Sequence, residues 1–513
     1  MSLGFVIRYS ATTPNTQPPA PQFSVKGARS QRTCALHSGV LESTVIGQVE
    51  DHEDNLFFCG HVANWIEVAQ RLASRGLSRK GLASQIHCIK LIYQIYGVPG
   101  LRMLDGLFVG VFVDKGNLVA FASKTPGPSI YFRVNNDTGT VCISTELKAL
   151  PAHERRLRSF ADIIDKRDAQ QSAQTCMHEV LRVRQGHCIE ISLHPPQITA
   201  IDTEYYSTCR AITLFEEATV IEKLRDTLAQ SVSSLPGRTA HCLVSGGLDS
   251  SIVGYFAQQR FDTLNLFSLG TEKNNEFDNA EAFGSSIGLP VSRILVKDNQ
   301  FIGALPEVVA LTEHCFSTFV EYLIPVHLAH QKINDSADIM LSGYGSDVLF
   351  AGFAKPANTL RQVTELVESE YASTAWANEA SQCLCSGVGM EIGYPFFDSR
   401  VVDLAFSIDP YLKHKHGVEK YILREAFRGI LNDTVIARRK VGIHEGTGCE
   451  DYLTNQVAQR SAEKARLVKD AMCYRILQQV LIDGLAPYDV AMDTLHADAL
   501  NIARDPAHAD ALL

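Results

Sequence analysis

Short apolar runs separated by turn residues occupy much of the first two hundred residues. The clearest run, LFVGVFV at 107–113, is followed by a polar DKGN turn and a second run at 118–121, a pattern typical of a β-hairpin. Elsewhere apolar residues recur at helical spacing. The elements we expect are strands at 107–113, 118–121, 141–144 and 187–193, and helices at 64–73 and 86–96. Together they predict an α+β domain.

Near residue 205 the pattern changes to strands that alternate with helices. The expected elements here are strands at 240–244, 263–268, 293–296 and 338–342, and helices at 217–232, 250–259 and after 276. This alternation predicts a parallel sheet with helices on both faces, whose ligands lie beyond the carboxyl ends of the strands. Beyond about residue 350 the chain is mostly helical. We therefore expect two domains, 1–207 and 208–513.

Composition narrows the class of protein. The net charge of −10 argues against nucleic acid as a partner, and no apolar run approaches the ~20 residues of a membrane span. The first 19 residues lack the features of a signal peptide, and 12–22 is expected to be a mobile loop. Thirteen cysteines without a CxxC pair favour a reducing cytoplasm and argue against a zinc site. A cytoplasmic protein is expected.

The turn LVSGGLDSS, at 243–251, carries the first candidate chemistry. Gly246 and Gly247 follow a strand and precede a helix, so backbone N–H groups there can bind an anion. Hydroxyl donors flank the turn at Ser245, Ser250 and Ser251. The carboxylate of Asp249 suits such a site if Mg²⁺ lies between it and phosphates. The turn therefore predicts a pyrophosphate cradle, although a tight turn with a serine cap and nothing bound would look similar.

The S-G-G-x-D-S string resembles the signature of ATP pyrophosphatases, which cleave ATP to AMP and pyrophosphate. SLG at 268–270 resembles their adenine-contacting segment, and the segments that begin at 394 and 412 resemble the C-terminal region of asparagine synthetases. GLFVGVFVD, SIYFRV and STELKALPA resemble, more weakly, the glutaminase domain of those enzymes. The resemblance implies an Ntn-hydrolase-like αββα domain followed by a parallel-sheet ATP pyrophosphatase domain of the adenine nucleotide α-hydrolase-like kind.

The N-terminal segment departs from an active glutaminase. Such a domain needs cysteine directly after the initiator methionine, and here the chain begins Met1-Ser2-Leu3. FFCGH at 57–61 replaces the Asn-Gly that would form an oxyanion hole. An inactive, structural domain is expected.

The synthetase part departs from asparagine synthetases in a different direction. Tyr344, within SGYGSD, replaces their glutamate, and RKVGIHEG follows at 439–446. Together with NNEF at 274–277 and EYLIP at 321–325, these strings resemble the β-lactam and carbapenam synthetases. The resemblance implies that a substrate carboxylate is adenylated and that an amine of the same molecule attacks it, closing a four-membered ring.

The resemblance also implies residue roles. Tyr344 and Glu379 would form a dyad that takes the proton of the amine, and Lys440 would stabilise the oxyanion. Asp249 and Asp347 would hold Mg²⁺. ATP or pyrophosphate contacts are expected from Val244, Ser245, Gly246, Gly247, Asp249, Ser250, Ser251, Ser268, Leu269, Gly343 and Lys420. Substrate contacts are expected from Tyr322, Gly345 and Glu370.

Each of these residues also has a structural interpretation. Tyr344 alone would be a packing tyrosine, and Glu370 and Glu379 would be solvated helix residues. Lys440 belongs to a basic run at 438–440. His444 and Glu445 suggest a metal site, but they are only two residues and they are adjacent in the sequence. A structural role therefore fits them better.

These patterns predict an ATP- and Mg²⁺-dependent ligase that closes a β-lactam ring in the biosynthesis of an antibiotic or toxin. A clavam-type precursor, a carbapenam and tabtoxinine-β-lactam are candidate products, and departures from the first two favour the third. The alternatives are an ammonia-dependent asparagine synthetase, a macrolactam-forming peptide cyclase and a regulatory nucleotide-binding protein. A small amino-acid-like substrate is expected, with no nucleic-acid or membrane partner. The oligomeric state stays open, and a homodimer is one candidate.

Overall fold

The computed structural model describes residues 4–11, 28–36, 39–46, 50–52, 56–74, 84–165, 173–193, 198–333, 336–387, 390–458 and 465–506. The chain divides into two compact units, each considered by itself below. The first comprises Met1–Ser207, Ile476–Val490 and Asp505–Leu513, and the second comprises Thr208–Arg475 and Ala491–Arg504. The loop expected at 12–22 lies outside the described residues. None of the described helices combines the length and apolar character that a membrane crossing requires.

The first unit is built on antiparallel sheets. Its strands are β1 Gly4–Ala11, β2 Ala28–Leu36, β3 Gly39–Ile46, β4 Glu50–His52, β5 Leu56–Val62, β6 Gly106–Asp114, β7 Asn117–Ala122, β8 Tyr131–Asn135, β9 Thr140–Ser144, β10 Leu181–Arg182, β11 His187–Ser192 and β12 Thr199–Glu204. Its helices include α1 Trp65–Ala73, α2 Gln85–Tyr96 and α3 Phe160–Asp165. Within the described residues the two sheets run β10-β8-β9-β1-β3-β2 and β12-β11-β7-β6-β5-β4. The predicted hairpin is confirmed, because β6 pairs with β7 in antiparallel register.

Neighbouring residues of β5 serve two different apolar layers. Phe57 packs between the two sheets, where its ring centroid lies 5.6 Å from that of Phe5 on β1. Phe58 packs on the opposite face with Phe108 of β6 and with α1 and α2. Because successive strand residues point to opposite faces, a strand buried on both sides reads as a continuous apolar run. This explains why β5 and β6 carry little polar alternation.

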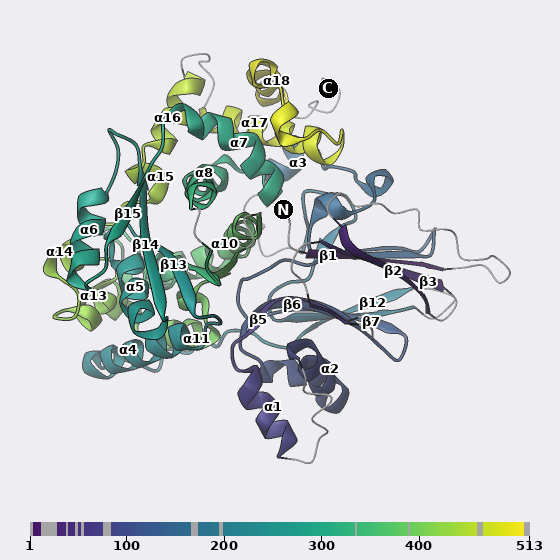
Figure 1. Cartoon of the computed structure of the whole chain (residues 1–513), viewed down its shortest axis with the longest axis horizontal. Coiled ribbons are helices and arrows are strands. Elements are labelled where there is room, and N and C mark those ends of the chain that lie inside the picture. Colours follow the sequence, from purple (N-terminus) through teal and green to yellow (C-terminus); the bar gives the residue numbers. More distant parts are fainter. Residues whose placement is uncertain are drawn as a thin grey trace. The chain divides into compact units, whose positions relative to one another are not determined.

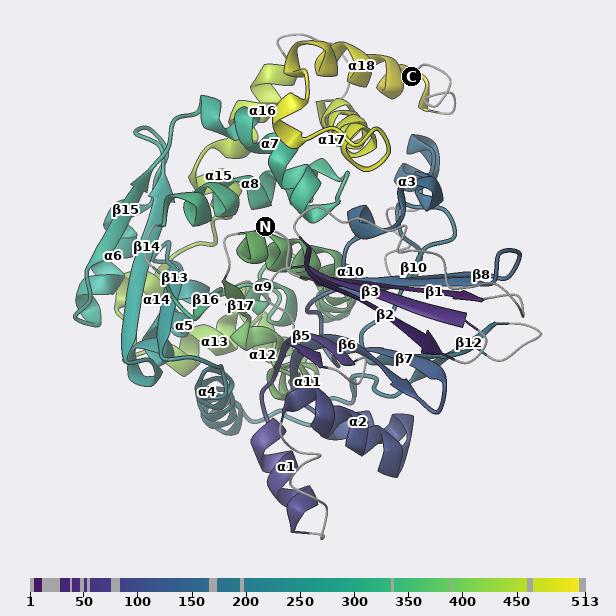
Figure 2. The ribbon, with the colours of Figure 1, turned by 45° about the vertical axis from the view of Figure 1, so that its right-hand side comes forward.

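The second unit contains a parallel sheet. Its strands are β13 Thr239–Leu243, β14 Thr263–Gly270, β15 Val291–Leu295, β16 Ile339–Leu341 and β17 Glu391–Gly393. In the described part of this unit they run in the order β15-β14-β13-β16-β17, and every pair is parallel. The predicted parallel sheet is therefore confirmed, and β17 is an additional strand of three residues. In Figure 2, β16 and β17 continue the sheet beyond β13.

Helices surround this sheet. They are α4 Glu217–Ser233, α5 Leu248–Arg260, α6 Phe277–Ser286, α7 Asn299–Thr312, α8 Ser317–Lys332, α9 Ser346–Leu349, α10 Leu360–Gly387, α11 Ser399–Ser407, α12 Pro410–Lys413, α13 Tyr421–Phe427, α14 Asp433–Ala437, α15 Ile443–Gly446, α16 Cys449–Ala458, α17 Ala465–Leu481 and α18 Met492–Arg504. Figure 1 shows β13, β14 and β15 with α6 on one side and α8 on the other. Both faces are therefore covered, as the alternating pattern predicted.

Residues of β14 show how each face is buried. Leu266 faces α6, because a Cβ at Gly284 of that helix would lie 3.7 Å from Leu266 Cδ1. The next residue, Phe267, points to the opposite face, where its ring centroid lies 5.1 Å from that of His241 on β13. His241 in turn acts electrostatically on His330 of α8.

The strand order locates the crevice in which such sheets bind ligands. From β13 the chain moves outward to β14 and β15, and then returns to the other side of β13 as β16. The direction of strand addition therefore reverses between β13 and β16, and ligands bind beyond the carboxyl ends of strands at such a switch point. The two loops that leave this point are 244–247 and 342–345, both of which carry predicted site residues.

Candidate active site

The glycine turn after β13 requires glycine at its centre. Gly246 has φ +68°, a conformation that L side chains rarely adopt, and a Cβ there would overlap the backbone of Asn279. Gly247 N donates to Ser245 Oγ at 3.2 Å, and α5 begins directly afterwards. Asp249 lies in the first turn of this helix. The turn therefore brings backbone N–H groups and a carboxylate to the end of β13.

The loop after β16 lies directly against this turn. A Cβ at Gly343 would be 2.7 Å from Ser250 N and 2.8 Å from the carbonyl carbon of Asp249. Gly345 has φ +104°, and a Cβ there would be 2.8 Å from the ring of Phe397. Both glycines of SGYGSD are therefore explained by close approach, and the short helix α9 that follows brings Asp347 to the same place.

Four charged side chains meet between these two loops. Lys420 Nζ lies 2.7 and 2.6 Å from the two carboxylate oxygens of Asp249 and 2.6 Å from Asp347 Oδ1. Lys440 Nζ pairs with the other oxygen of Asp347. Lys420 and Asp347 are 3% and 9% exposed, whereas Asp249 and Lys440 are 18% and 31% exposed, so the network has a buried centre and a partly exposed edge. Sequence analysis selected all four residues, and the structure brings them together.

Electrostatics within the network favour the ionised carboxylate. Burial opposes ionisation of Asp347, but the nearby ammonium groups of Lys420 and Lys440 outweigh it and hold its pKa below the ordinary value. Burial disfavours the charged form of Lys440, yet Asp347 and then Asp249 raise its pKa above the ordinary value. Asp347 and Lys440 therefore each favour the charged form of the other.

The network fits a magnesium nucleotide. Carboxylate oxygens are ligands that Mg²⁺ prefers, and the space between Asp249 and Asp347 already holds a cation in the ammonium group of Lys420. The hydroxyls of Ser251 and Ser346 are buried and have no hydrogen-bond partner among the described residues. Buried polar groups are normally satisfied, so each can receive a hydrogen-bonding ligand or water.

Lys420 itself stands in an uncommon backbone conformation. Its φ is +54°, in the left-handed region that non-glycine residues enter at a cost of about 1–3 kcal/mol, and α13 begins at the next residue. Such conformations persist where the surrounding structure holds them, and they cluster at functional sites.

Aromatic rings surround Tyr344 at the edge of the network. Its ring centroid lies 5.9 Å from that of Tyr322, 5.6 Å from Phe397 and 6.4 Å from Tyr394. Burial, and then the charges of Tyr322, Glu370 and Asp347, raise the pKa of Tyr344 well above its ordinary value. The phenol is therefore protonated near neutral pH.

The two predicted glutamates of α10 have different outcomes. Glu370 is half-buried, and burial together with Asp347 raises its pKa. Its charge also acts on Tyr344, so the structure brings it to the reaction side of the sheet. Glu379 lies in the same helix, but its side chain is outside the described part of the structure. The Tyr344–Glu379 dyad therefore stays a prediction.

The predicted adenine segment lies at the carboxyl end of the neighbouring strand. Ser268 and Leu269 are buried within β14, 3% and 7% exposed. Val244 N donates to Phe267 O at 2.8 Å, which ties the start of the glycine turn to β14. Tyr322, a predicted substrate contact, is half-buried on α8. Its ring centroid lies 6.2 Å from that of His444.

Sequence analysis missed one residue that supports the glycine turn. The guanidinium of Arg438 donates to the backbone oxygen of Ser245 and pairs with Glu276. Arg438 thus connects the turn after β13 to the segment that leads into α6. Its position two residues before Lys440 was the available signal, but sequence analysis gave a role in this run only to Lys440.

The HEG part of RKVGIHEG caps a short helix. Glu445 Oε2 accepts a hydrogen bond from Gly442 N at 2.8 Å, at the start of α15. His444, Glu445 and Glu450 bring possible ligand atoms within 4.8 Å of one another. The cap supports the structural interpretation of Glu445.

The chain is similar in sequence to known proteins over most of its length. Residues 223–383 and 380–486, just over half of the chain, match the asparagine synthase family. The chain is 26% identical over 453 residues to the carboxyethyl-arginine beta-lactam-synthase of Streptomyces clavuligerus, which covers 86% of this chain and 85% of that protein. It is 25% identical to the glutamine-hydrolysing asparagine synthetases of Cricetulus griseus and Homo sapiens, over 72% and 70% of this chain and 70% and 67% of those proteins.

These similarities confirm the predicted resemblance to the β-lactam synthetase type and the prediction of an ATP-dependent, amide-forming ligase. The chain belongs to the asparagine synthase family.

Proposed function

We propose that this enzyme uses Mg²⁺·ATP to adenylate a substrate carboxylate and closes a β-lactam ring by attack of an amine of the same molecule. AMP and pyrophosphate leave. The observation that carries the proposal is a network of four charged side chains beside Tyr344, namely Asp249, Lys420, Asp347 and Lys440. At the position of Tyr344, asparagine synthetases have glutamate. The network supplies a nucleotide site, and Tyr344 supplies a different group for the amine.

Asp249 and Asp347 would hold the metal, and the backbone N–H groups of the glycine turn would face the phosphates. When bound, Mg²⁺ neutralises charge on the triphosphate and on the leaving pyrophosphate. Lys420 is positioned to contact the phosphates once the metal takes its place between the carboxylates. Arg438 keeps the turn in position through Ser245.

Tyr344 would move the proton that the attacking amine must lose. Its raised pKa means that the phenol is protonated at rest, so it accepts a proton only while giving its own away. A carboxylate must therefore receive the phenolic proton, and Glu379 is the proposed acceptor. Lys440 would then stabilise the oxyanion of the tetrahedral intermediate.

A substrate that carries an amine suits the acidic side of this site. Glu370 and Asp347 both act on Tyr344, and Tyr322 lies beside it. With Gly345, Glu370 and Tyr322 form the proposed substrate surface. Ring closure is strained, so cleavage of the acyl adenylate must supply the drive, and holding the amine and the adenylate in one orientation lowers the barrier. We place tabtoxinine-β-lactam first among the candidate products, in the biosynthesis of an antibiotic or toxin.

The first unit is proposed to be a glutaminase-like domain without glutaminase activity. FFCGH, which replaces the expected Asn-Gly, lies within β5, and all its residues pair with β6. The strand lacks the asparagine of the Asn-Gly that would form an oxyanion hole, which supports a domain without glutaminase activity.

The test is pyrophosphate release from Mg²⁺·ATP with a panel of β-amino acids, followed by mass spectrometry of the product. Loss of one water from a β-amino acid, absent in Tyr344→Phe, is the expected result. Pyrophosphate release with aspartate and ammonia alone would instead establish asparagine synthesis. Turnover of a linear peptide, and of no small acid, would overturn the proposal in favour of a macrolactam-forming cyclase.

A further inference from the structure

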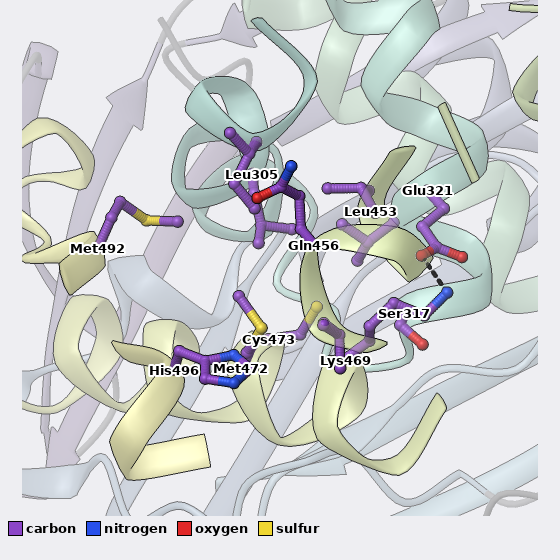
Figure 3. Close-up of a pocket in the computed structure, with 13 residues that line it drawn as sticks. Leu305, Ser317, Glu321, Leu453, Gln456, Lys469, Met472, Cys473, Met492 and His496 are labelled. Atoms are coloured by element: carbon purple, nitrogen blue, oxygen red, sulfur yellow. Dashed lines mark ion pairs between the residues drawn. The ribbon is translucent and has the colours of Figure 1, made fainter. Parts of the chain in front are cut away.

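A cavity of about 190 Å³ lies among α7, α8, α16, α17 and α18 of the second unit (Figure 3). Each helix contributes residues three or four apart, which lie on one helix face. The lining residues used below are Val320, Glu321, Val457, Lys469 and Met472. The repeated helical spacing shows that one face of each helix is turned toward a common space.

The cavity is apolar along most of its wall and charged at one place. Glu321 Oε1 and Lys469 Nζ lie 2.5 Å apart, as the dashed line in Figure 3 marks. Their side chains are 7% and 11% exposed, and Lys469 also donates to Thr454 Oγ1 at 3.0 Å. Val320, Val457 and Met472 are among the apolar residues of the wall. A buried ion pair at the wall of an apolar space is a specific feature, because burying two charges is costly.

This cavity is separate from the proposed reaction site. None of its lining residues belongs to the predicted nucleotide, metal or catalytic set. Glu321 and Tyr322 are neighbours on α8, and consecutive helix residues point about 100° apart. Tyr322 accordingly contacts Tyr344 and His444, whereas Glu321 faces the cavity.

We propose that the cavity binds an aliphatic α-amino acid, whose ammonium group pairs with Glu321 and whose carboxylate pairs with Lys469. Apolar cavities of about 150 Å³ accept benzene, so this larger one suits a ligand of about eight non-hydrogen atoms, the size of valine or leucine. The side chain would occupy the wall formed by Val320, Val457 and Met472.

The ion pair of Glu321 and Lys469 is the reason for proposing a ligand that carries both a positive and a negative charge. A ligand with a single charge would draw one partner away and leave the other buried and unpaired, which is strongly destabilising. A ligand with both charges side by side satisfies Glu321 and Lys469 together. The carboxyl of Glu321 supports the ammonium contact, because burial raises its pKa to about 7 despite Lys469, so a further cation would stabilise its ionised form.

The experiment is isothermal titration calorimetry of the full chain, without ATP, against valine, leucine, isoleucine and methionine. Isoamylamine and 4-methylpentanoate keep the apolar body of leucine and lack one charge each. Saturable binding of an amino acid is expected, with the single-charge analogues roughly ten- to hundredfold weaker. No saturable binding of any of the four amino acids, or equal affinity for leucine and 4-methylpentanoate, would overturn the proposal.

Variants locate the binding. Lys469→Met should weaken leucine binding by a similar factor, and Val457→Phe should abolish it by filling the cavity. Glu281→Gln, in an exposed ion pair with Arg293, and Tyr322→Phe, at the proposed reaction site, should bind leucine as the unaltered chain does. If Lys469→Met does not fold, Val457→Phe and the analogue series still decide the matter. Unchanged binding in folded Val457→Phe would place leucine elsewhere. Because no turnover is measured, this outcome is independent of the proposed reaction.

Discussion

Lys420 and Asp249 form a two-point ion pair, in which Nζ lies 2.7 Å from one carboxylate oxygen and 2.6 Å from the other. The two residues are 171 positions apart in the sequence. The same ammonium group lies 2.6 Å from Asp347, so a single cation separates two carboxylates that come from the helices that follow the two switch-point loops, α5 and α9. The position of that cation is the reason for assigning a metal–phosphate site here.

Replacing Lys420 with methionine tests whether Asp249 and Asp347 need a cation between them. Without the ammonium group, Asp249 loses its cation and the buried Asp347 keeps only Lys440, so we expect a loss of up to about 3–5 kcal/mol in the free energy of unfolding. Mg²⁺ should restore part of this loss and should raise the Tm of Lys420→Met more than that of the unaltered chain. Pyrophosphate release should fall at least roughly hundredfold. Thermal melts with and without Mg²⁺ measure the first effect.

Lys415→Met is the matched control for this prediction. Lys415 pairs with Glu217 at 2.7 Å, but both side chains are partly exposed, so its removal should cost much less stability than removal of Lys420. Equal Mg²⁺ effects on the two variants would contradict a cation site between Asp249 and Asp347.

Tyr344→Phe removes one hydroxyl and keeps the ring that packs against Phe397. We expect turnover to fall roughly 10²- to 10⁴-fold, while nucleotide binding and the free energy of unfolding change little, because the lost group acts on the proton of the amine. Steady-state kinetics and ATP titration separate these quantities. Tyr394→Phe makes the same change at a neighbouring ring and should retain most activity. Retained turnover in Tyr344→Phe would exclude the phenol from proton transfer.

Alanine at Gly246 and at Gly247 should have unequal effects. Gly246 has φ +68° and no room for a Cβ, whereas Gly247 has φ −80° and its nearest atom to a Cβ is Ser245 Oγ at 3.1 Å. Gly246→Ala should therefore cost at least about 1–2 kcal/mol from the backbone alone, and more because the loop must shift. Gly247→Ala should cost less than about 1 kcal/mol. Denaturant titrations of both variants give the comparison, and similar losses would mean that the turn adopts another conformation.

Glu321 should make stability depend on pH. Burial is the largest cause that raises the pKa of Glu321, to about 7 in the folded chain. Lys469 lowers this pKa, whereas Glu450 and Asp470 raise it further. The ordinary value is 4.5, so the folded chain binds this proton more tightly than the unfolded chain does. Stability from this group is therefore present below pH 4.5 and is lost as pH rises to about 7, by on the order of 3 kcal/mol.

Glu321→Gln should remove that decline. Urea titrations between pH 4.5 and 8, without added amino acids, give the difference in unfolding free energy between the unaltered chain and the variant. This difference should shift in favour of the variant as pH rises. A difference that stays constant across this range would show that Glu321 is ionised throughout. Glu281 is the control, because its hydrogen bond with Arg293 lowers the pKa of its carboxylate instead of raising it. Glu281→Gln should therefore show no such shift.

The local elements of this chain were readable from its residues. The hairpin of β6 and β7, the strand before the glycine turn and the helix after it all depend on neighbours within a few positions. The same locality explains why β17 was missed, because a strand of three residues is too short to show a pattern. Asp249 and Gly246 could be placed at a strand end for this reason, and the resemblance of motifs supplied roles for Tyr344 and Lys440.

Only the tertiary structure decided which of these residues meet. Lys420 reaches Asp249, and Arg438 reaches Ser245 across 193 positions, because the strand order of the sheet reverses between β13 and β16. The spacing of apolar residues within β13 or β16 does not reveal that the strand order reverses between them. The cavity likewise needs faces from helices between residues 299 and 504, and each face reads by itself as ordinary core spacing. Sequence determined the local turn chemistry through short-range sterics, whereas packing at a topological switch point determined the charge network.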